Sequence, residues 1–147
     1  MLVLNKYKLE DIEVGQVFEI QKDLSLDQIQ QFAVLTDDHH PLHTSKEYAV
    51  NNGFKDIMAH GLLISSFSSA LIGMKIPGEN AIIISQAFKY RQPAFPGDVL
   101  TIKGTVKEKE LRFNNIAVKI RITNQSNKLI ATGEYVVKIR VVQGSKN

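Results

Sequence analysis

The chain has 147 residues, which is enough for one domain with a single hydrophobic core. With 44% hydrophobic and 22% charged residues, it has the composition of a soluble globular protein, which excludes a disordered chain. It contains no cysteine, and this excludes disulfides, a thiolate nucleophile and a cysteine-based zinc site. The net charge of +3 is spread along the chain without a basic block, so we expect no nucleic-acid partner.

The distribution of charged and apolar residues gives an expectation about location. Charges occur within the first ten positions, and no apolar run approaches the ~20 residues of a membrane span. We therefore expect a soluble, unexported, cytoplasmic protein with no membrane partner.

The first predicted elements are a strand and a short amphipathic helix. Residues 16–22 alternate apolar with polar side chains, which is typical of a strand. In residues 25–36 the apolar side chains recur at near-helical spacing, and Ser25 is a suitable N-cap. Gln28, three positions later, would complete a capping box. The sequence therefore predicts a helix that begins just after Ser25.

Residues 36–44 predict a loop that separates this helix from two more. Pro41 lacks an amide donor and disfavours helical backbone at the residue before it. Residues 45–51 predict a further short helix, which Gly53 ends. Residues 60–78 begin with a long apolar helix that has little polar face, so we expect it to be buried on nearly every side.

The second half of the chain changes to a β period. It contains four β-rich stretches separated by turn signals, at residues 82–92, 98–110, 115–125 and 128–142. In the third stretch, isoleucine and valine alternate with less apolar residues such as Lys119 and Arg121, as in an antiparallel strand with one solvated face. The sequence predicts the α+β class, with an isolated buried helix followed by an antiparallel meander.

The residues that carry chemistry are concentrated between positions 37 and 61. All four histidines fall within 22 residues, and two aspartates lie beside three of them. Asp38 and His43 are five positions apart across a proline-bent loop, so their side chains can converge without sharing a helix face. A carboxylate and an imidazole together supply the two proton-transfer groups that the addition of water requires.

The start of the apolar helix, at His60 and Gly61, is a second component. Backbone amides at a helix start have no intrahelical partner, and the helix dipole is positive there. A developing oxyanion would be stabilised at this position. Gly61 has no Cβ, so a ligand can approach the backbone closely.

These motifs resemble those of the R-specific enoyl-CoA hydratases and related MaoC-like dehydratases. The segment TDDHHPLHTSKEYA, followed by AHGLL, is similar to the family's signature, and SQAFKYRQPAFPGD is similar to a later strand of the family. The matching positions are Thr36, Asp38, Pro41, Leu42, His43, His60 and Gly61. Two positions depart from the signature, because His40 stands where the family usually has Asn and Asp37 where it has Gly.

The resemblance implies one hotdog-fold domain over residues 1–147, in which a curved antiparallel sheet wraps around a long central helix. It also implies a homodimer or higher homo-oligomer, with active sites at the dimer interface. The implied reaction interconverts trans-2-enoyl and (R)-3-hydroxyacyl thioesters of CoA or acyl carrier protein, in fatty acid metabolism, without a cofactor.

The resemblance also assigns roles to single residues. Asp38 and His43 would be the catalytic pair, and the Gly61 amide would be the oxyanion donor. Ser69 on the central helix matches a serine that supports the site. His40 would support the site if its imidazole can make the hydrogen bonds of the usual Asn.

Several of these residues also have a structural interpretation. The run from residue 37 to 43 is compatible with a polar loop whose aspartates cap a helix. For His39 and His60 the structural role is favoured, and Ser69 is compatible with simple packing on a buried helix.

Lys89 and Arg91 lie in the segment SQAFKYRQPAFPGD, which resembles a later strand of the family. Their side chains could bind the phosphates of CoA or the acidic helices of an acyl carrier protein. A solvated strand edge is the favoured interpretation.

Three other functions are compatible with the sequence. A metal-binding site would use the ligand set Asp38, His40, His43 and His60. A non-catalytic hotdog protein would bind acyl groups or partners, and a hotdog thioesterase would hydrolyse acyl-CoA. Hotdog thioesterases usually carry a carboxylate on the central helix, but residues 61–74 contain no Asp or Glu. Hydration is therefore favoured over hydrolysis.

Overall fold

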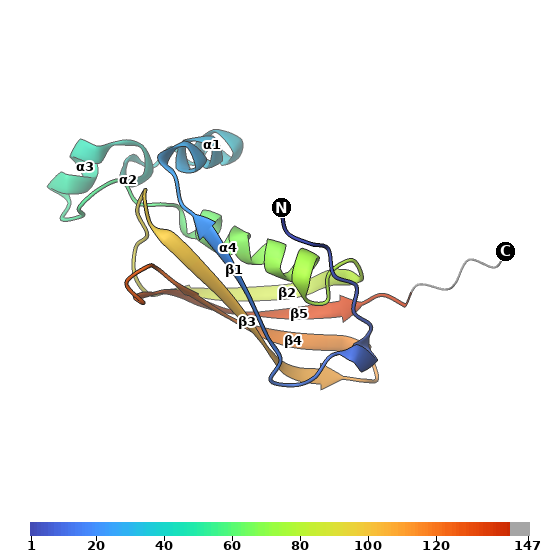
Figure 1. The fold of residues 1–147 in the computed structure, drawn as a ribbon. Helices are drawn as coiled ribbons and strands as arrows, with labels where there is room; N and C mark the ends of the chain where they lie inside the picture. Colours follow the sequence, from blue (N-terminus) through green and yellow to red (C-terminus); the bar gives the residue numbers. More distant parts are fainter. Residues whose placement is uncertain (142–147) are drawn as a thin grey trace.

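The computed structural model describes residues 1–141, and its main feature is a five-stranded antiparallel sheet packed against one long helix (Figure 1). The strands are β1 (Val17–Asp23), β2 (Ala81–Tyr90), β3 (Val99–Glu110), β4 (Asn115–Thr123) and β5 (Leu129–Ile139). They lie in the order β1-β3-β4-β5-β2, and each neighbouring pair is antiparallel. The expected α+β class and hotdog arrangement are confirmed. Val142, which ends the fourth predicted β stretch, lies outside the described residues.

The order of the strands corrects the predicted meander. Only β3, β4 and β5 form one, whereas β2 pairs with β5 at the far edge of the sheet. The connection from β2 to β3 contains Pro93 and Pro96, which cannot supply the amide donors of a tight hairpin. It therefore crosses the end of the sheet instead of pairing its two flanking strands.

The long helix consists of α4 (Gly61–Ala70) and a π-helical turn, η2 (Leu71–Lys75), that continues it. Its inner side belongs to the core, through Leu63, Ile64, Leu71 and Ile72. The prediction of burial on nearly every side is wrong, because Leu62 is 68% exposed and Ser66 and Ser69 are also exposed. These exposed residues border a hollow beside β2, and no segment of residues 1–141 covers it.

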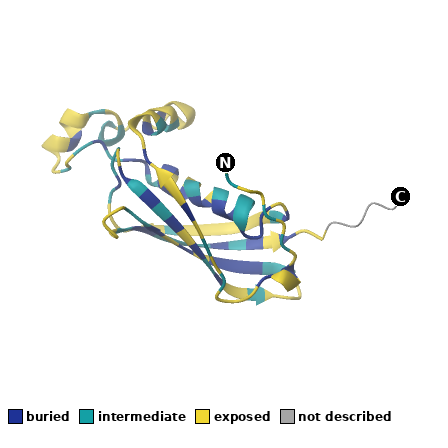
Figure 2. Cartoon of the chain, viewed as in Figure 1, coloured by how far each residue is buried: buried dark blue, intermediate teal, exposed yellow. Residues whose placement is uncertain are grey.

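Three helices form an overhang, residues 26–51, beyond one end of the sheet (Figure 1). They are α1 (Leu26–Thr36), α2 (Pro41–Thr44) and α3 (Lys46–Asn51). α1 begins as predicted, because Ser25 Oγ accepts from the Gln28 amide and the Gln28 side chain accepts from the Ser25 amide. Much of the overhang is exposed, in contrast to the buried interior of the sheet (Figure 2).

Helix α2 corrects the prediction of a loop over residues 36–44. Only residues 37–40 are irregular, and Pro41 is the first residue of a helical turn. Proline is favoured at that position, since the first amide of a helix has no intrahelical acceptor and the fixed φ of proline is helical. The short helix predicted over residues 45–51 is α3, with Ser45 as its N-cap.

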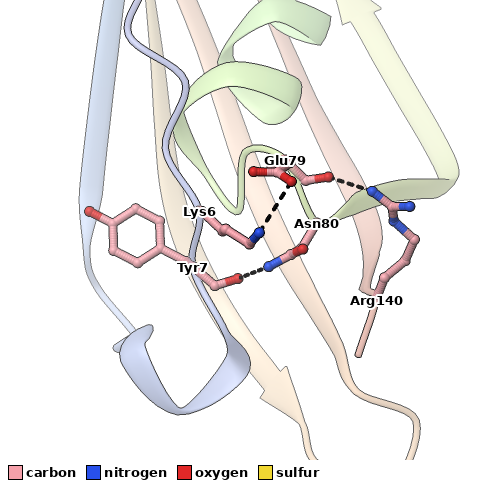
Figure 3. Close-up of polar contacts among 5 residues, drawn as sticks. All are labelled: Lys6, Tyr7, Glu79, Asn80 and Arg140. Carbon is pink, nitrogen blue, oxygen red and sulfur yellow. Dashed lines mark hydrogen bonds and ion pairs between the residues drawn. The ribbon is translucent and has the colours of Figure 1, made fainter. Parts of the chain in front are cut away.

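The N-terminal segment holds the turn that follows the long helix (Figure 3). Lys6 Nζ lies 3.2 Å from Glu79 Oε1. The Asn80 side-chain amide donates to the Tyr7 carbonyl at 3.1 Å, and Arg140 donates to the Glu79 carbonyl at 2.7 Å. The N-terminal segment and Arg140 thus both contact the residues just before β2. These contacts fix the C-terminal end of the long helix, which lies away from the overhang.

The PGD turn before β3 has a structural role. Asp98 is 4% exposed, and its carboxylate accepts hydrogen bonds from the Phe95 amide and the Gln125 side chain, both at 2.9 Å. Gly97 has a φ of 94°, a backbone conformation that residues with a Cβ rarely adopt. Because both carboxylate oxygens of Asp98 are hydrogen-bonded, this residue anchors the turn.

In the described part of the chain, no helix is long and apolar enough to cross a membrane. The cytoplasmic location expected from the sequence remains a prediction.

Candidate active site

Asp38 lies in the loop between α1 and α2, and the backbone of that loop sets its position. α1 ends at Thr36, and Asp37 turns the chain with a left-handed backbone of φ 58°. Asp tolerates this conformation, so Asp37 can stand where the family usually has Gly. Asp38 Oδ1 then accepts a hydrogen bond from the His40 amide at 3.3 Å. The loop is stabilised locally while the Asp38 side chain stays exposed.

His40 caps α2 through its imidazole ring. Its Nδ1 accepts a hydrogen bond from the Leu42 amide at 3.2 Å. An Asn side-chain oxygen makes the same kind of bond when it is an N-cap. Only an unprotonated Nδ1 can accept, so the ring hydrogen of His40 is on Nε2 in this arrangement. His40 thus replaces the usual Asn as a cap for the helical turn that carries His43.

His43 lies in that turn, and its tautomer follows from its partner. Its Nδ1 lies 2.8 Å from the Met58 carbonyl oxygen, which can only accept, so Nδ1 carries the hydrogen. Nε2 therefore keeps its lone pair. Burial lowers the pKa of His43 below its usual value and outweighs the opposing effect of the Met58 hydrogen bond. The lowered pKa favours a neutral imidazole, and the Met58 hydrogen bond fixes the tautomer that can accept a proton at Nε2.

His60 links the loop of Asp38 to His43. It is 2% exposed, and its Nε2 donates to the Asp38 carbonyl at 3.0 Å. Its ring is stacked on the His43 ring, with centroids 3.8 Å apart and planes inclined by 26°. Phe32 of α1 contacts its ring at a centroid distance of 4.9 Å. His60 therefore holds Asp38 through the backbone and His43 through ring contact.

The predicted pair is brought together in the structure. One polar atom from each of Asp38, His43 and His60 lies within 4.8 Å of the other two. These residues also belong to the predicted metal-ligand set, but the rings of His43 and His60 are nearly parallel. A shared ion would have to lie in both ring planes at about 2.0–2.1 Å from each nitrogen, which stacked rings do not allow. The arrangement fits proton transfer better than metal binding.

A pocket of about 330 Å³ joins His43 to the start of α4. Gly61 lines it, and as the first residue of α4 it has no intrahelical acceptor for its amide. The ring of Tyr90 packs against the same glycine, because a Cβ at position 61 would come within 2.9 Å of Tyr90 Cζ. A larger residue there would displace the Tyr90 ring, and the Gly61 amide is available to a developing oxyanion.

Two tyrosines of the sheet are bonded to serines of α4. The Tyr90 hydroxyl donates to Ser65 Oγ at 3.0 Å, and the Tyr135 hydroxyl lies 2.7 Å from Ser68 Oγ. Burial raises the pKa of Tyr135, so the phenol stays protonated. Ser69 lies on the exposed side of α4 and borders the hollow beside β2. Within residues 1–141 it does not line the pocket of His43, and its supporting role stays a prediction.

Lys89 and Arg91 lie at the end of β2 nearest the overhang. Both side chains are exposed and line a hollow bordered by residues of β3, β4 and β5. Arg91 also lines the pocket that contains His43. The structure therefore places Arg91 between the two features, while substrate binding by this pair stays a prediction.

Three contributors to the site were not singled out by the motifs. Met58 acts through its carbonyl group, which no pattern of side chains signals. Phe32 follows the ordinary apolar spacing of α1 and cannot be distinguished from core residues by sequence. Tyr90 had a signal, because it occupies the segment SQAFKYRQ that resembles the family's strand.

The fold and the site define a hotdog protein with a carboxylate–imidazole pair at the start of its central helix. The chain belongs to the MaoC-like family, since the profile of the MaoC like domain matches residues 9–128. It is 32% identical to an (R)-specific enoyl-CoA hydratase of Aeromonas caviae, over 88% of this chain and 97% of that protein. A 3-hydroxybutyryl-CoA dehydratase of Methylorubrum extorquens is 33% identical, over 88% of this chain and 82% of the relative. An unliganded R-hydratase from Pseudomonas aeruginosa superposes with a TM-score of 0.87 at 28% identity, covering 97% of this chain and 96% of that one.

The substitution His60→Phe is expected to raise the pKa of His43. Phenylalanine keeps the volume and the ring stack, but it removes an imidazole whose charge lowers the His43 pKa. An NMR pH titration of the His43 ring measures the shift. His39→Ala, at an exposed position of the same loop, is the matched control and should leave the titration unchanged. An equal or lower His43 pKa in His60→Phe would contradict the assigned contact.

Proposed function

We propose that this chain interconverts trans-2-enoyl thioesters and (R)-3-hydroxyacyl thioesters, by adding or removing water, in fatty acid metabolism. The observation that carries the proposal is the placement of Asp38 beside His43, together with a pocket that both His43 and Gly61 line. Membership of the MaoC-like family supports it, as do the hydratase and dehydratase names of the relatives. The chain is thus a hydro-lyase in this proposal.

In the hydration direction, a water molecule is held between the Asp38 carboxylate and Nε2 of His43. Asp38 takes a proton from this water while the water oxygen bonds to Cβ of the enoyl group. The electrons of the double bond move toward the thioester oxygen, where the Gly61 amide stabilises the charge by about 3 kcal/mol. A proton then passes from the Asp38–His43 pair to Cα, which restores both groups and completes the addition of one water.

This reaction needs proton transfer and charge stabilisation, and the chain's own residues supply both. Water addition involves no net oxidation or reduction, and the thioester carbonyl itself acidifies Cα. The Met58 carbonyl fixes the hydrogen of His43 on Nδ1, so the lone pair of Nε2 is available to the water. We therefore propose that no resident cofactor takes part.

Two alternative functions have less support. A thioesterase would lack its usual carboxylate on the central helix, because α4 and η2 contain neither Asp nor Glu. A non-catalytic acyl-binding protein would have no use for a neutral imidazole held beside a carboxylate. Hydration of crotonyl-CoA by the purified protein separates the enzyme from both alternatives.

We also propose that the chain works as a homodimer that pairs along β2. This edge strand carries the exposed residues Ile82, Ile83 and Ile84, which are between 40% and 56% exposed. A long apolar strand edge is normally covered in native proteins. The adjoining hollow of about 510 Å³ is bordered by Leu62 and Phe32, so a second copy seated there would also cover the exposed side of α4.

Asp38→Asn and His43→Ala are each expected to lower the rate of crotonyl-CoA hydration by about 10² to 10⁴-fold. Asp38→Asn removes the group that takes the proton, and His43→Ala removes the second proton-transfer group. The thermal unfolding midpoint should change little for Asp38→Asn, because the side chain is exposed. His39→Ala is the control and should keep wild-type activity. Activity near wild type in either catalytic variant would refute the assignment.

His40→Asn is expected to extend activity to lower pH. When His40 becomes protonated, its Nδ1 can no longer accept from the Leu42 amide, so the turn that carries His43 loses its cap. Asn keeps the cap at every pH. Removing the charge of His40 would raise the His43 pKa and move the acid limb the opposite way, but among the causes of the His43 pKa shift this one is the smallest. The pH profile of kcat/KM on one enoyl-CoA measures the difference, and coincident acid limbs would show that His40 does not tune the site.

Ile84→Lys is expected to convert a dimer into a monomer. A charge on the exposed edge of β2 opposes the pairing of two such edges. Sedimentation at micromolar concentration measures the mass of each variant. Leu111→Lys is the control, since Leu111 is 74% exposed in the turn between β3 and β4, and this variant should remain a dimer. A fully active wild-type monomer would rule out the pairing.

A further inference from the structure

The sheet carries a group of basic side chains on the face opposite the long helix. Along β3 and β4, residues such as Ile102 and Ile120 are buried toward the helix, and the alternating residues are exposed on the other face. A hollow of about 650 Å³ lies there. We call it the cationic hollow, because five basic residues line it: Lys89, Arg91, Lys103, Lys119 and Arg121.

The strand register places these charges close together. Lys103 on β3 lies directly opposite Arg121 on β4, and Arg121 lies opposite Thr132 on β5. Thr132 in turn lies opposite Lys89 on β2. One row across four strands thus holds three cations within roughly 15 Å, given about 4.8 Å between neighbouring strands. Like charges directly opposite one another are destabilising, so the pair Lys103 and Arg121 costs stability unless an anion is present.

The acidic residues near the hollow do not neutralise these charges. Among residues 1–141, Glu134 is the one acidic residue that lines it. Glu134 lies directly opposite Lys119 on β4, but its carboxylate is bonded to Lys107, outside the group, at 3.1 Å. Glu19 on β1 is opposite Lys103, but among residues 1–141 no ion pair joins the two. With five basic residues and one acidic residue in its lining, the hollow keeps a net positive charge that an external anion can neutralise.

The hollow is also connected with the candidate active site. Arg91 lines both the cationic hollow and the pocket that contains His43 and Gly61. A ligand with its reactive end at His43 and a polyanionic end beyond Arg91 would engage both. A CoA thioester has this form, because a flexible pantetheine arm separates the acyl group from a nucleotide that carries three phosphates.

We propose that the cationic hollow binds the phosphate groups of the CoA nucleotide while the acyl thioester lies at Asp38 and His43. This inference rests on the proposed function and selects CoA as the carrier of the substrate. The volume of the hollow is within the range of small-molecule sites, about 300–1,000 Å³. Its cations line one hollow of the size of a small ligand, whereas docking of an acidic protein needs a wide and continuous contact area.

The test compares two substrates that share the reacting group. Crotonyl-CoA carries the nucleotide, and the crotonyl thioester of N-acetylcysteamine lacks it. In the double variant Lys103→Gln with Arg121→Gln, the KM for crotonyl-CoA should rise about tenfold or more with kcat unchanged. The KM for the truncated thioester should stay at the wild-type value. The fold should be kept, because the substitutions relieve a like-charge contact.

Lys138→Gln is the matched control for this experiment. Lys138 is exposed on the same face of β5 as Thr132, but it does not line the cationic hollow. This variant removes one cation and should leave the KM for both substrates unchanged. A similar rise of KM in the control would mean that general charge, and not the hollow, governs CoA binding, which would overturn the proposal.

A second measurement does not depend on turnover. Adenosine 3′,5′-bisphosphate, which lacks the pantetheine arm, should bind the wild-type protein in calorimetry and bind the double variant about tenfold more weakly. Equal binding to both proteins, or an unchanged KM for crotonyl-CoA, would overturn the inference.

If the double variant loses activity only with a crotonyl carrier protein, the surface docks that protein instead, and CoA binding is refuted. If the wild type hydrates neither thioester, the proposed function fails, while the calorimetry still decides whether the hollow binds the nucleotide.

Discussion

Two hydrogen bonds that run in opposite directions hold the candidate active site together. The Asp38 carbonyl accepts from His60, and the Met58 carbonyl accepts from His43. The bond from His60 joins the start of the long helix to the loop between α1 and α2. The bond from His43 joins α2 to the segment just before the long helix. The stacked rings of His43 and His60 give a third contact between the two parts. Since each bond fixes one ring tautomer, the same contacts that hold the backbone also leave a lone pair on His43 Nε2.

The site lies where a buried part of the molecule meets an exposed one. The helix and the inner face of the sheet form a core rich in isoleucine, and this core fixes Gly61 and Tyr90. The overhang contributes Asp38, which is exposed, and His43, which is partly buried. Proton transfer and oxyanion stabilisation are strongest away from bulk water. A partner seated along β2 would supply enclosure that one copy of residues 1–141 lacks, which connects the proposed dimer with the proposed chemistry.

The parts of the structure that depend on local sequence were predictable, and the parts that depend on distant contacts were not. The capping box at Ser25 and Gln28 and the strand alternation around Lys119 follow from neighbouring residues. Pro93 and Pro96 disfavour a hairpin between β2 and β3, but no local pattern indicates that β2 pairs with β5 at the far edge. The resemblance predicted Asp38, His43 and Gly61; the structure places Asp38 beside His43, and His43 and Gly61 along one pocket. It could not identify Met58, because a backbone carbonyl leaves no mark on the residue type.

The two departures from the family's signature fall on positions that act through the backbone. Asp37 adopts a left-handed conformation for which Gly is the usual residue, and His40 caps α2 as Asn would. Neither residue supplies an atom to the group of Asp38, His43 and His60. Substitutions at such positions are tolerated when the new side chain meets the same backbone requirement. Replacing His43 would be different, because its ring donates to Met58 and, in the proposed mechanism, accepts from water at the same time. The departures therefore act mainly through the loop that presents the site, and beyond the backbone His40 adds only a small lowering of the His43 pKa.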